Sequence, residues 1–209
     1  MAIINLFGAS GHAKVIMDII EAQGNKVSVL YDDNPHCAEL HAHPVLKASD
    51  TIVEGPLIIS IGSNKARKLL SEKYPLRYAK AMHPAANISE SVEIGEGTVV
   101  MAGATINADT KIGNHSIINT NSSVDHECVI GDYVHISPNV ALCGNVHVGE
   151  GTLIGVGASV IPGIKIGRWC TIGAGSVVVR DIPDGKSAYG NPCKVKNNNL
   201  NYNQQSTKE

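Results

Sequence analysis

The sequence predicts two units, a small α/β unit followed by a parallel β-helix built from six-residue repeats. Over residues 1–82, short apolar runs alternate with segments of helical periodicity. From Ala86, sixteen hexads follow without an insertion, and the third residue of each is Ile, Val or Leu. The chain is 43% hydrophobic but only 4% aromatic, so we expect a narrow interior filled by aliphatic side chains.

Composition excludes several functional classes. The formal net charge is −2, so nucleic acid and anionic membranes are not expected partners. Five scattered cysteines without a CxxC pair argue against a disulfide framework and against a thiolate zinc site. No apolar run approaches the roughly 18 residues of a membrane span. We therefore expect a cytoplasmic protein without membrane insertion.

The first unit, residues 1–82, alternates strand and helix. Ile3–Phe7 is expected to form a buried strand, and a helix starts at His12 and ends near Gly24. Residues 26–33 form the second strand. Residues 55–62 hold the third strand, which a turn joins to the second helix. Such alternation predicts a parallel sheet with Rossmann-like handedness.

The turn from Gly8 to Gly11 lies where such folds bind phosphate groups, at a helix N-terminus with free backbone N–H groups. It is not a GxGxxG motif, so a plain strand–helix turn is the alternative. Asp32 follows roughly 20 residues after the glycines, where an acid often meets a ribose hydroxyl. Because the unit is short for a dinucleotide domain, a mononucleotide or nucleotide sugar is the better ligand class.

The second unit, residues 83–196, shows a period of 18 above the period of six. Ile-Gly or Val-Gly pairs recur at Gly95, Gly113, Gly131, Gly149 and Gly167. Three hexads therefore make one coil of a triangular prism, with the third positions stacked inside. Each such buried side chain is worth about 1.5–3 kcal/mol. The polar residues 197–209 are expected to be a disordered tail.

The segments FGASGHAKVIMDII (7–20) and NTNSSVDHECVIGDYVHISPNVALCGNVHVGEGTLIGVGASVIPG (119–163) together carry a family resemblance. The hexads resemble the hexapeptide-repeat acyltransferases. The pairing with the N-terminal unit resembles the sialic-acid O-acetyltransferase and UDP-4-amino-sugar N-acetyltransferase family. The resemblance implies a left-handed β-helix, a homotrimer, acetyl-CoA as co-substrate without a metal, and a nucleotide-sugar substrate, UDP-linked.

The cluster of Asp125, His126 and Glu127 is the first candidate for chemistry. Because Val124 points inward, His126 should face outward at a prism corner, with the small residues Ala108 and Gly144 one coil away. A surface histidine is the alternative. A carboxylate on one ring nitrogen would raise the basicity of the other. The resemblance implies that His126 and Glu127 form the general base, with Asp125 as a second possible partner.

The same resemblance implies further sites on the β-helix. The backbone N–H of Gly144 would stabilise the oxyanion, and His135 would contact acetyl-CoA. Gly173 and Gly175 would admit the pantetheine arm. GNPCK resembles a closing GxPAK loop, with Cys193 where alanine is usual. A turn glycine and a surface histidine are the plain alternatives at Gly144 and His135.

In the N-terminal unit, the resemblance assigns Gly8, Ser10, Gly11 and His12 to the nucleotide sugar. It assigns Asp32 and the turn Gly62, Ser63 and Asn64, more loosely, to the uridine or ribose. The expected reaction is N-acetylation of a nucleotide-linked 4-amino-4,6-dideoxy sugar for a bacterial surface glycan.

Three other readings stay open. One is O-acetylation of sialic acid or another hydroxyl. A second is a trimeric zinc hydratase using His126, His135 and His147, although their spacing lacks the close pair of that family. The third is a non-catalytic scaffold, which would leave the acid–histidine cluster unexplained.

Overall fold

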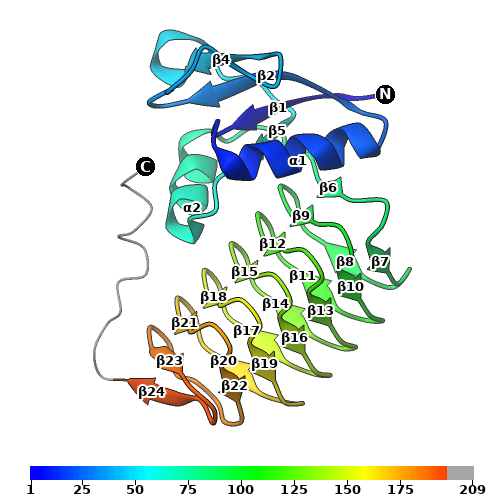
Figure 1. Cartoon of the computed structure of the whole chain (residues 1–209), viewed down its shortest axis with the longest axis vertical. Helices are drawn as coiled ribbons and strands as arrows, with labels where there is room; N and C mark the ends of the chain where they lie inside the picture. Colours follow the sequence, from blue (N-terminus) through cyan, green and yellow to red (C-terminus); the bar gives the residue numbers. More distant parts are fainter. Residues whose placement is uncertain (197–209) are drawn as a thin grey trace.

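A computed structural model describes residues 1–196 and shows an α/β subdomain seated on a β-solenoid (Figure 1). The subdomain holds a five-stranded sheet with α1 packed on one face and α2 on the other, and both helices contact the solenoid. In chain order its elements are β1 (Ile3–Phe7), α1 (Gly11–Ala22), β2 (Lys26–Asp32), β3 (Glu39–Leu40), β4 (His43–Lys47), the 3₁₀ turn η1 (Ala48–Asp50), β5 (Leu57–Ile59) and α2 (Asn64–Lys73).

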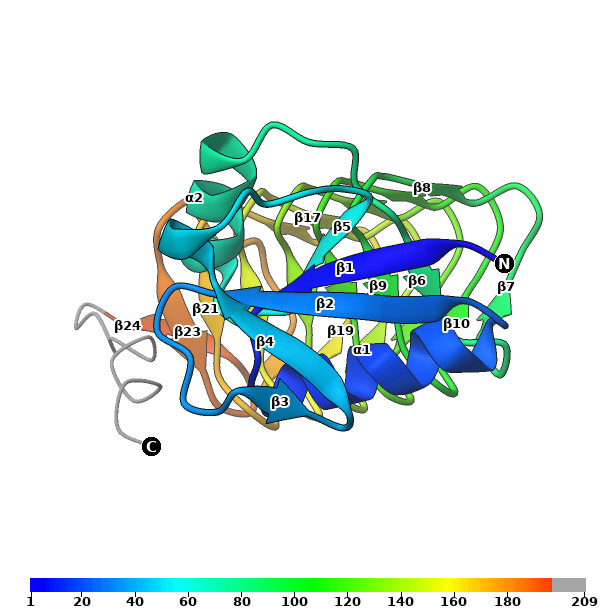
Figure 2. The same ribbon diagram turned by 90° about the horizontal axis from the view of Figure 1, so that it is seen from above.

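The strand order β3-β4-β2-β1-β5 confirms the predicted parallel core of the sheet. β1 pairs in parallel with β2 and β5, and β2 with β4. The antiparallel β3–β4 hairpin was not predicted. Its strands carry only one buried residue, Val45, so they leave no apolar pattern in the sequence. Figure 2 shows the sheet lying across the solenoid.

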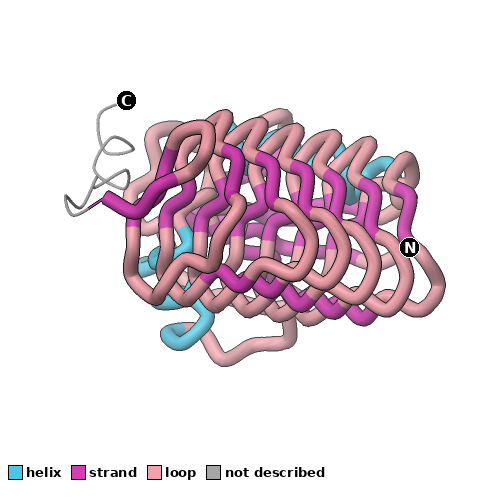
Figure 3. The backbone as a smooth tube through the Cα atoms, turned by 90° about the horizontal axis from the view of Figure 1, so that it is seen from below, coloured by secondary structure: helices cyan, strands magenta, loops and turns pink. Residues whose placement is uncertain are grey.

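The solenoid is a stack of two-residue strands joined by four-residue corners (Figure 3). They are β6 (Ala81–Met82), β7 (Asn87–Ile88), β8 (Glu93–Ile94), β9 (Val99–Val100), β10 (Thr105–Ile106), β11 (Lys111–Ile112), β12 (Ile117–Ile118), β13 (Ser123–Val124), β14 (Val129–Ile130), β15 (His135–Ile136), β16 (Ala141–Leu142), β17 (His147–Val148), β18 (Leu153–Ile154), β19 (Ser159–Val160), β20 (Lys165–Ile166), β21 (Thr171–Ile172) and β22 (Val177–Val178), followed by the longer β23 (Ser187–Tyr189) and β24 (Lys194–Lys196).

These strands form three sheets, one for each face of the prism. The domain face is the eight-stranded sheet that contains β6, β15 and β21; the other two are the six-stranded and five-stranded faces. Partners along each face are 18 residues apart, as in Val124 with Leu142, which confirms the predicted coil. The first strand, β6, pairs with β9, so the solenoid begins at Ala81 rather than at the expected residue 83. The predicted tail, residues 197–209, lies outside the described residues.

The corners follow a rule that the sequence analysis did not identify. From residue 97 to residue 175, the sixth residue of each hexad has a positive φ, between 52° and 75°. Ten of these fourteen residues are Gly, Asn or Asp, which tolerate the left-handed region. The exceptions are His115, Glu127, Tyr133 and Trp169. The regularly spaced Ile-Gly and Val-Gly glycines serve another purpose: a Cβ on Gly95 would lie 2.5 Å from the Gly113 carbonyl carbon of the next coil.

The solenoid has a core of its own, and a second core joins the two units. Aliphatic third positions such as Val124 and Ile154, both 0% exposed, fill the prism as predicted. A second core lies under α1, where Ile16 and Met17 pack with Val99 and Ile117 of the domain face. This contact places the N-terminus of α1 and the strand β15 on the same side of the solenoid.

Candidate active site

His126 lies on the corner formed by residues 125–128, which we call the catalytic corner after its proposed role; it joins β13 of the six-stranded face to β14 of the five-stranded face. Its side chain is 57% exposed, as the hexad pattern predicts. The His126 Nδ1 atom lies 3.1 Å from Oε2 of Glu127. Because a carboxylate only accepts, this contact puts the proton on Nδ1 and leaves Nε2 free to act as a base.

The backbone of Glu127 explains how adjacent residues can pair. On an extended strand, consecutive side chains point to opposite faces. Glu127 is instead left-handed, with φ of 58°, and this turns its carboxylate back onto the imidazole. The same conformation recurs at this position of every hexad from 97 to 175, and at a non-glycine residue it costs roughly 1–3 kcal/mol. The structure therefore places Glu127, and not Asp125, on the His126 ring.

Asp125 braces the backbone of the catalytic corner. Its Oδ1 accepts from the His126 backbone N–H at 2.9 Å and from Asn107 Nδ2 at 2.8 Å. The hydrogen bond from Asn107, followed by that from His126, lowers the pKa of Asp125. Thr110 Oγ1 donates to the Asp125 carbonyl at 2.7 Å. Sequence reasoning missed Asn107, although it stands 18 residues before Asp125 and hence one coil away.

Gly144 lies against the ring of His126, as the coil arithmetic predicts. A Cβ added at Gly144 would lie 2.5 Å from His126 Cε1. The neighbouring Asn145 donates its backbone N–H to the His126 carbonyl at 2.9 Å. Within residues 1–196 no acceptor takes the N–H of Gly144 itself. The corner therefore offers a base, its orienting acid and a free backbone donor side by side.

Two histidines lie close together at the junction between the two units. His12, in the first turn of α1, has its ring centroid 6.5 Å from that of His135 on β15. Asn119 Nδ2 donates to His135 Nε2 at 3.0 Å. Sequence analysis assigned these histidines to different substrates, whereas the structure puts both rings in one place.

Both junction histidines are neutral at physiological pH. Burial, together with the charge of Arg67, lowers the pKa of His12 to about 4. The same causes, with His12 as a further contributor, lower the pKa of His135 to about 3. His12 Nε2 is buried and has no hydrogen-bond partner among the described residues. A neutral ring nitrogen of this kind is available to a ligand that donates or accepts a hydrogen bond.

The glycine-rich turn, Gly8–Gly11, is held in place by residues from two other segments, Asp32 and Ile61. Gly8 has φ of 113°, and a Cβ there would lie 2.7 Å from Ile61 Cγ1. The Asp32 carboxylate accepts from the Ala9 backbone N–H at 2.9 Å, so it braces the turn. Ser10 is the N-cap residue of α1 and makes no capping bond with its side chain. The predicted grouping of Gly8, Ser10, Gly11, His12 and Asp32 is thus present in the structure.

The predicted turn Gly62, Ser63 and Asn64 divides into two roles. Ser63 Oγ caps α2 by accepting from the Ala66 N–H at 3.4 Å. Asn64 is only 8% exposed, and its Nδ2 donates to the Gly151 carbonyl of the solenoid at 3.0 Å. Its Oδ1 accepts from Arg67, which sequence reasoning missed. The expected contact of Asn64 with a nucleotide is therefore corrected: its side chain docks α2 on the solenoid.

The C-terminal coils separate the two glycines predicted for pantetheine. A Cβ on Gly173 would lie 2.6 Å from Tyr189 Cβ, so packing under Tyr189 accounts for that glycine. Gly175 has open space around it and a φ of 65°. A cavity of about 190 Å³ lies between the ends of β15, β18 and β21 and includes Gly155 and Ala174. Gly175 directly follows Ala174 in the wall of that cavity, and its contact with pantetheine stays a prediction. Gly173 is instead needed for the packing of Tyr189.

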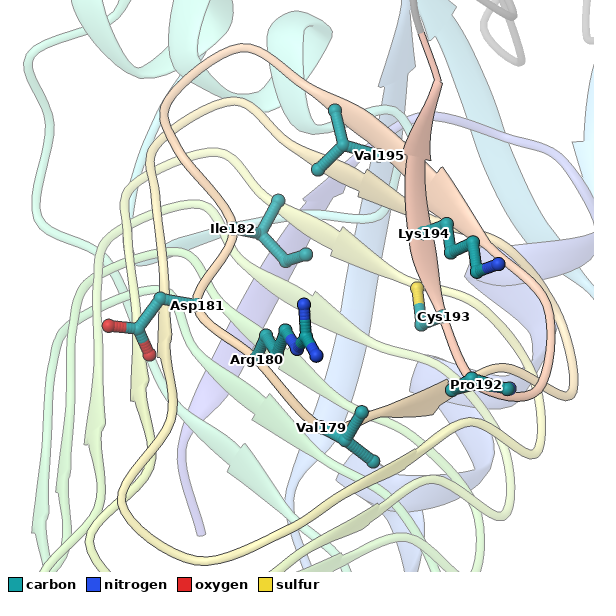
Figure 4. Close-up of a pocket in the computed structure, with 8 residues that line it drawn as sticks. All are labelled: Val179, Arg180, Asp181, Ile182, Pro192, Cys193, Lys194 and Val195. Carbon is teal, nitrogen blue, oxygen red and sulfur yellow. The ribbon is translucent and has the colours of Figure 1, made fainter.

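The closing loop forms one wall of a larger cavity at the end of the prism. This cavity of about 440 Å³ lies between the segment after β22 and strand β24 (Figure 4). Cys193 is 8% exposed on its wall, and burial raises the pKa of its thiol. The thiol is therefore packed inside the loop, and all five cysteines of the described residues are free.

Two further facts concern possible metal and membrane sites. Within residues 1–196, no three His, Cys, Asp or Glu side chains gather closely enough to hold a metal ion. His126, His135 and His147 lie on the catalytic corner, the domain face and the five-stranded face respectively. Over the same residues, no helix has the length and apolar character needed to cross a bilayer.

Comparison with known proteins connects both units to one kind of enzyme. Residues 3–74 match the PglD N-terminal domain family, and residues 109–144 and 145–180 match the six-repeat bacterial transferase hexapeptide family. The chain is 41% identical over 110 residues to UDP-N-acetylbacillosamine N-acetyltransferase of Bacillus subtilis. That match covers 47% of this chain and spans about half of the relative, 51% of its length.

Two solved structures match nearly the whole chain. A histidine-to-asparagine mutant of perosamine N-acetyltransferase from Caulobacter crescentus, in complex with CoA and GDP-perosamine, is 40% identical with a TM-score of 0.88. The match covers 95% of this chain and 98% of that one. The acetyltransferase domain of PglB from Neisseria gonorrhoeae, in complex with acetyl coenzyme A, is 33% identical with a TM-score of 0.85, over 93% and 98% of the two chains.

Proposed function

Because this chain belongs to the PglD-type hexapeptide-repeat sugar N-acetyltransferases, we propose that it transfers the acetyl group of acetyl-CoA to the 4-amino group of a nucleotide-linked 4-amino-4,6-dideoxy sugar. The product would serve the biosynthesis of a bacterial surface glycan. One observation carries the proposal: the exposed His126–Glu127 pair stands beside the free N–H of Gly144. General bases and oxyanion donors are the two groups that acyl transfer from a thioester requires.

In the proposed reaction, His126 Nε2 takes a proton from the acceptor amine as its nitrogen bonds to the thioester carbonyl carbon. The Gly144 N–H stabilises the oxyanion of the tetrahedral intermediate. The C–S bond then breaks, and the imidazolium returns its proton to the departing thiolate. The products are an acetamide and CoA. Glu127 holds the ring and stabilises its charged form during the reaction.

The nucleotide sugar is assigned to the junction. The Gly8–Gly11 turn offers the backbone N–H groups of Ser10 and Gly11 at the start of α1, where phosphates bind favourably, since those of Gly8 and Ala9 already donate to Tyr31 and Asp32. His12 and His135 lie just beyond this turn on the solenoid side. Among the relatives, the printed substrates include a UDP-linked and a GDP-linked sugar. UDP is our choice of nucleotide for this chain. Acetyl-CoA is assigned to the coils around Gly175.

A homotrimer is part of the proposal because one chain does not bring the two sites together. The catalytic corner lies between the six- and five-stranded faces, opposite the domain face that carries His135 and the subdomain. A base at the far corner can act on a sugar at the junction only if the two belong to neighbouring protomers. The five free cysteines fit a cytoplasmic enzyme.

The test is acetyl-CoA consumption with a panel of UDP-, GDP- and TDP-linked amino sugars, CMP-sialic acid and free sialic acid. Turnover with a 4-amino sugar is the expected result, with sedimentation as a trimer. Turnover only with the sialic acids would favour the O-acetyltransferase instead. An active monomer would contradict the shared site.

A further inference from the structure

Arg67 is the most heavily bonded side chain at the junction, although it is only 1% exposed. It lies on α2, and each of its three nitrogens donates hydrogen bonds. Nε donates to the His115 carbonyl at 2.8 Å, and Nη1 donates to the Ile61 carbonyl at 3.2 Å and the Gly62 carbonyl at 2.9 Å. Nη2 donates to Asn64 Oδ1 at 3.0 Å and to the carbonyls of Tyr133 and Val134 at 2.9 and 3.3 Å.

These bonds connect the two elements that border the His12–His135 pair. Ile61 and Gly62 belong to the turn after β5, which contacts the glycine-rich turn through Gly8. Val134 immediately precedes His135 on the solenoid. The planar guanidinium of Arg67 therefore fixes the Ile61–Gly62 turn of the subdomain against Tyr133 and Val134, the solenoid residues that directly precede His135.

The charge of Arg67 is not neutralised by a partner. All of its acceptors are uncharged, and within residues 1–196 no carboxylate forms an ion pair with it. Burial lowers its pKa to about 9, which leaves it protonated at neutral pH. Burying a cation without a carboxylate partner is costly. The hydrogen bonds from Arg67 to the buried carbonyls offset this cost, but they do not by themselves require a positive charge.

The groups that act electrostatically on the two rings are few. Arg67 acts on His12, and Arg67 and His12 act on His135, in both cases after burial; a hydrogen bond with the Gly62 backbone acts on His135 in the opposite direction and raises its pKa. A nucleotide sugar brings a negatively charged diphosphate to this region. If His12 and His135 were protonated, they would attract the diphosphate and draw it away from the glycine-rich turn. The site thus benefits from a cation that is fixed in place and from rings that stay neutral.

Building on the proposed function, we propose that Arg67 is a positioning residue of the nucleotide-sugar site. It sets the spacing between the Gly62 turn and His135, and its charge adds to burial in keeping His12 and His135 uncharged, so that both rings meet the substrate as neutral hydrogen-bond partners. Arg67 does not touch the reacting atoms, and it acts through the groups that it holds.

The kinetic test compares Arg67→Gln, which removes the charge, with Arg67→Lys, which keeps it. The matched control is Lys65→Gln, which removes an exposed charge from the same helix. In Arg67→Gln the KM for the nucleotide sugar should rise about tenfold, with the KM for acetyl-CoA within about twofold of wild type. Arg67→Lys should show a smaller rise, and Lys65→Gln none. An equal rise in both KM values would contradict a role confined to the sugar site.

The second test needs no substrate, so it is independent of the proposed function. Imidazole NMR titration of the wild-type protein should show His12 and His135 titrating near pH 4 and pH 3. Both midpoints should move upward in Arg67→Gln and stay in place in Arg67→Lys. Unchanged midpoints in Arg67→Gln would overturn the electrostatic role. If that variant does not fold, wild-type midpoints near the ordinary histidine value would do the same.

Discussion

The catalytic corner and the junction each place a histidine beside a residue that controls it, but by opposite physical means. At the corner, His126 is 57% exposed and its Glu127 partner is held by a strained left-handed backbone. At the junction, His12 and His135 are covered by packing, and a buried guanidinium bonds the surrounding carbonyls. The corner is built to exchange protons with a ligand, whereas the junction is built to remain neutral and fixed.

The difference separates chemistry from binding. A base must reach both of its protonation states near neutral pH, which requires access to solvent or substrate. A binding site gains from groups that are already ordered and do not change charge. Variants at the corner should therefore change kcat, and variants at the junction should change substrate KM or stability.

The largest expected effect is that of His126→Ala. Loss of the general base should lower kcat by about 10²–10⁴-fold with little change in either KM. Steady-state kinetics with both substrates would measure this. His147→Ala, on the neighbouring five-stranded face, is the control and should keep near wild-type turnover. Wild-type turnover in His126→Ala would contradict the assignment of the chemistry to the corner and of substrate binding to the junction.

A single methyl group should disturb the corner nearly as much. The Cβ of Gly144→Ala would lie 2.5 Å from His126 Cε1, so the ring must move away. A displacement of about 1 Å can cost about 10²-fold in rate. Because only a flexible side chain has to shift, we expect an unchanged Tm by calorimetry alongside the loss of kcat. A large drop in Tm would instead assign Gly144 to the scaffold.

Substitutions of Glu127 should all lower activity, but they should differ in their effect on stability. Glu127→Gln keeps the shape but loses the charge, so kcat should fall about tenfold. Glu127→Gly should lose as much activity yet unfold at a higher temperature than Glu127→Gln, because glycine accepts the φ of 58° without strain. Asp125→Asn tests the alternative partner. If it reduced kcat more than Glu127→Gln, Asp125 would be the orienting acid.

The last prediction concerns stability rather than activity, and it belongs to the junction. The folded-state pKa values of His12, His115 and His135 lie at about 4, 4 and 3, below the ordinary value of 6.5. The unfolded chain therefore binds more protons as the pH falls below 6.5, and the stability that neutral histidines provide is lost toward pH 4. The expected loss is about 1.4 kcal/mol per pH unit for each histidine.

Thermal unfolding between pH 7 and pH 4 measures this slope, with the solution kept at constant ionic strength. His115→Gln should reduce the slope by removing one of the three groups while leaving the active-site corner intact. A flat profile between pH 6.5 and pH 4.5 would mean that the junction histidines are already accessible to protons.

Much of the site followed from repeat arithmetic. The hexads placed Val124 inside and His126 outside, and the period of 18 put Gly144 against the ring. The choice between Asp125 and Glu127 did not follow, because it depends on a backbone turn at Glu127 that the residue type disfavours. Asn64 was misassigned because its place in a turn says nothing about which neighbour the helix docks on.

The sequence by itself determined the coil, its inward residues and its corners, since each coil packs on one that differs from it by 18 positions along the same chain. Only the tertiary structure decided how the subdomain sits on the solenoid. That contact brings Arg67 to the carbonyls of Tyr133 and Val134, residues 66 and 67 positions further along, and His12 to His135. No local period encodes such pairs, because they arise from the fit of two separately folded surfaces.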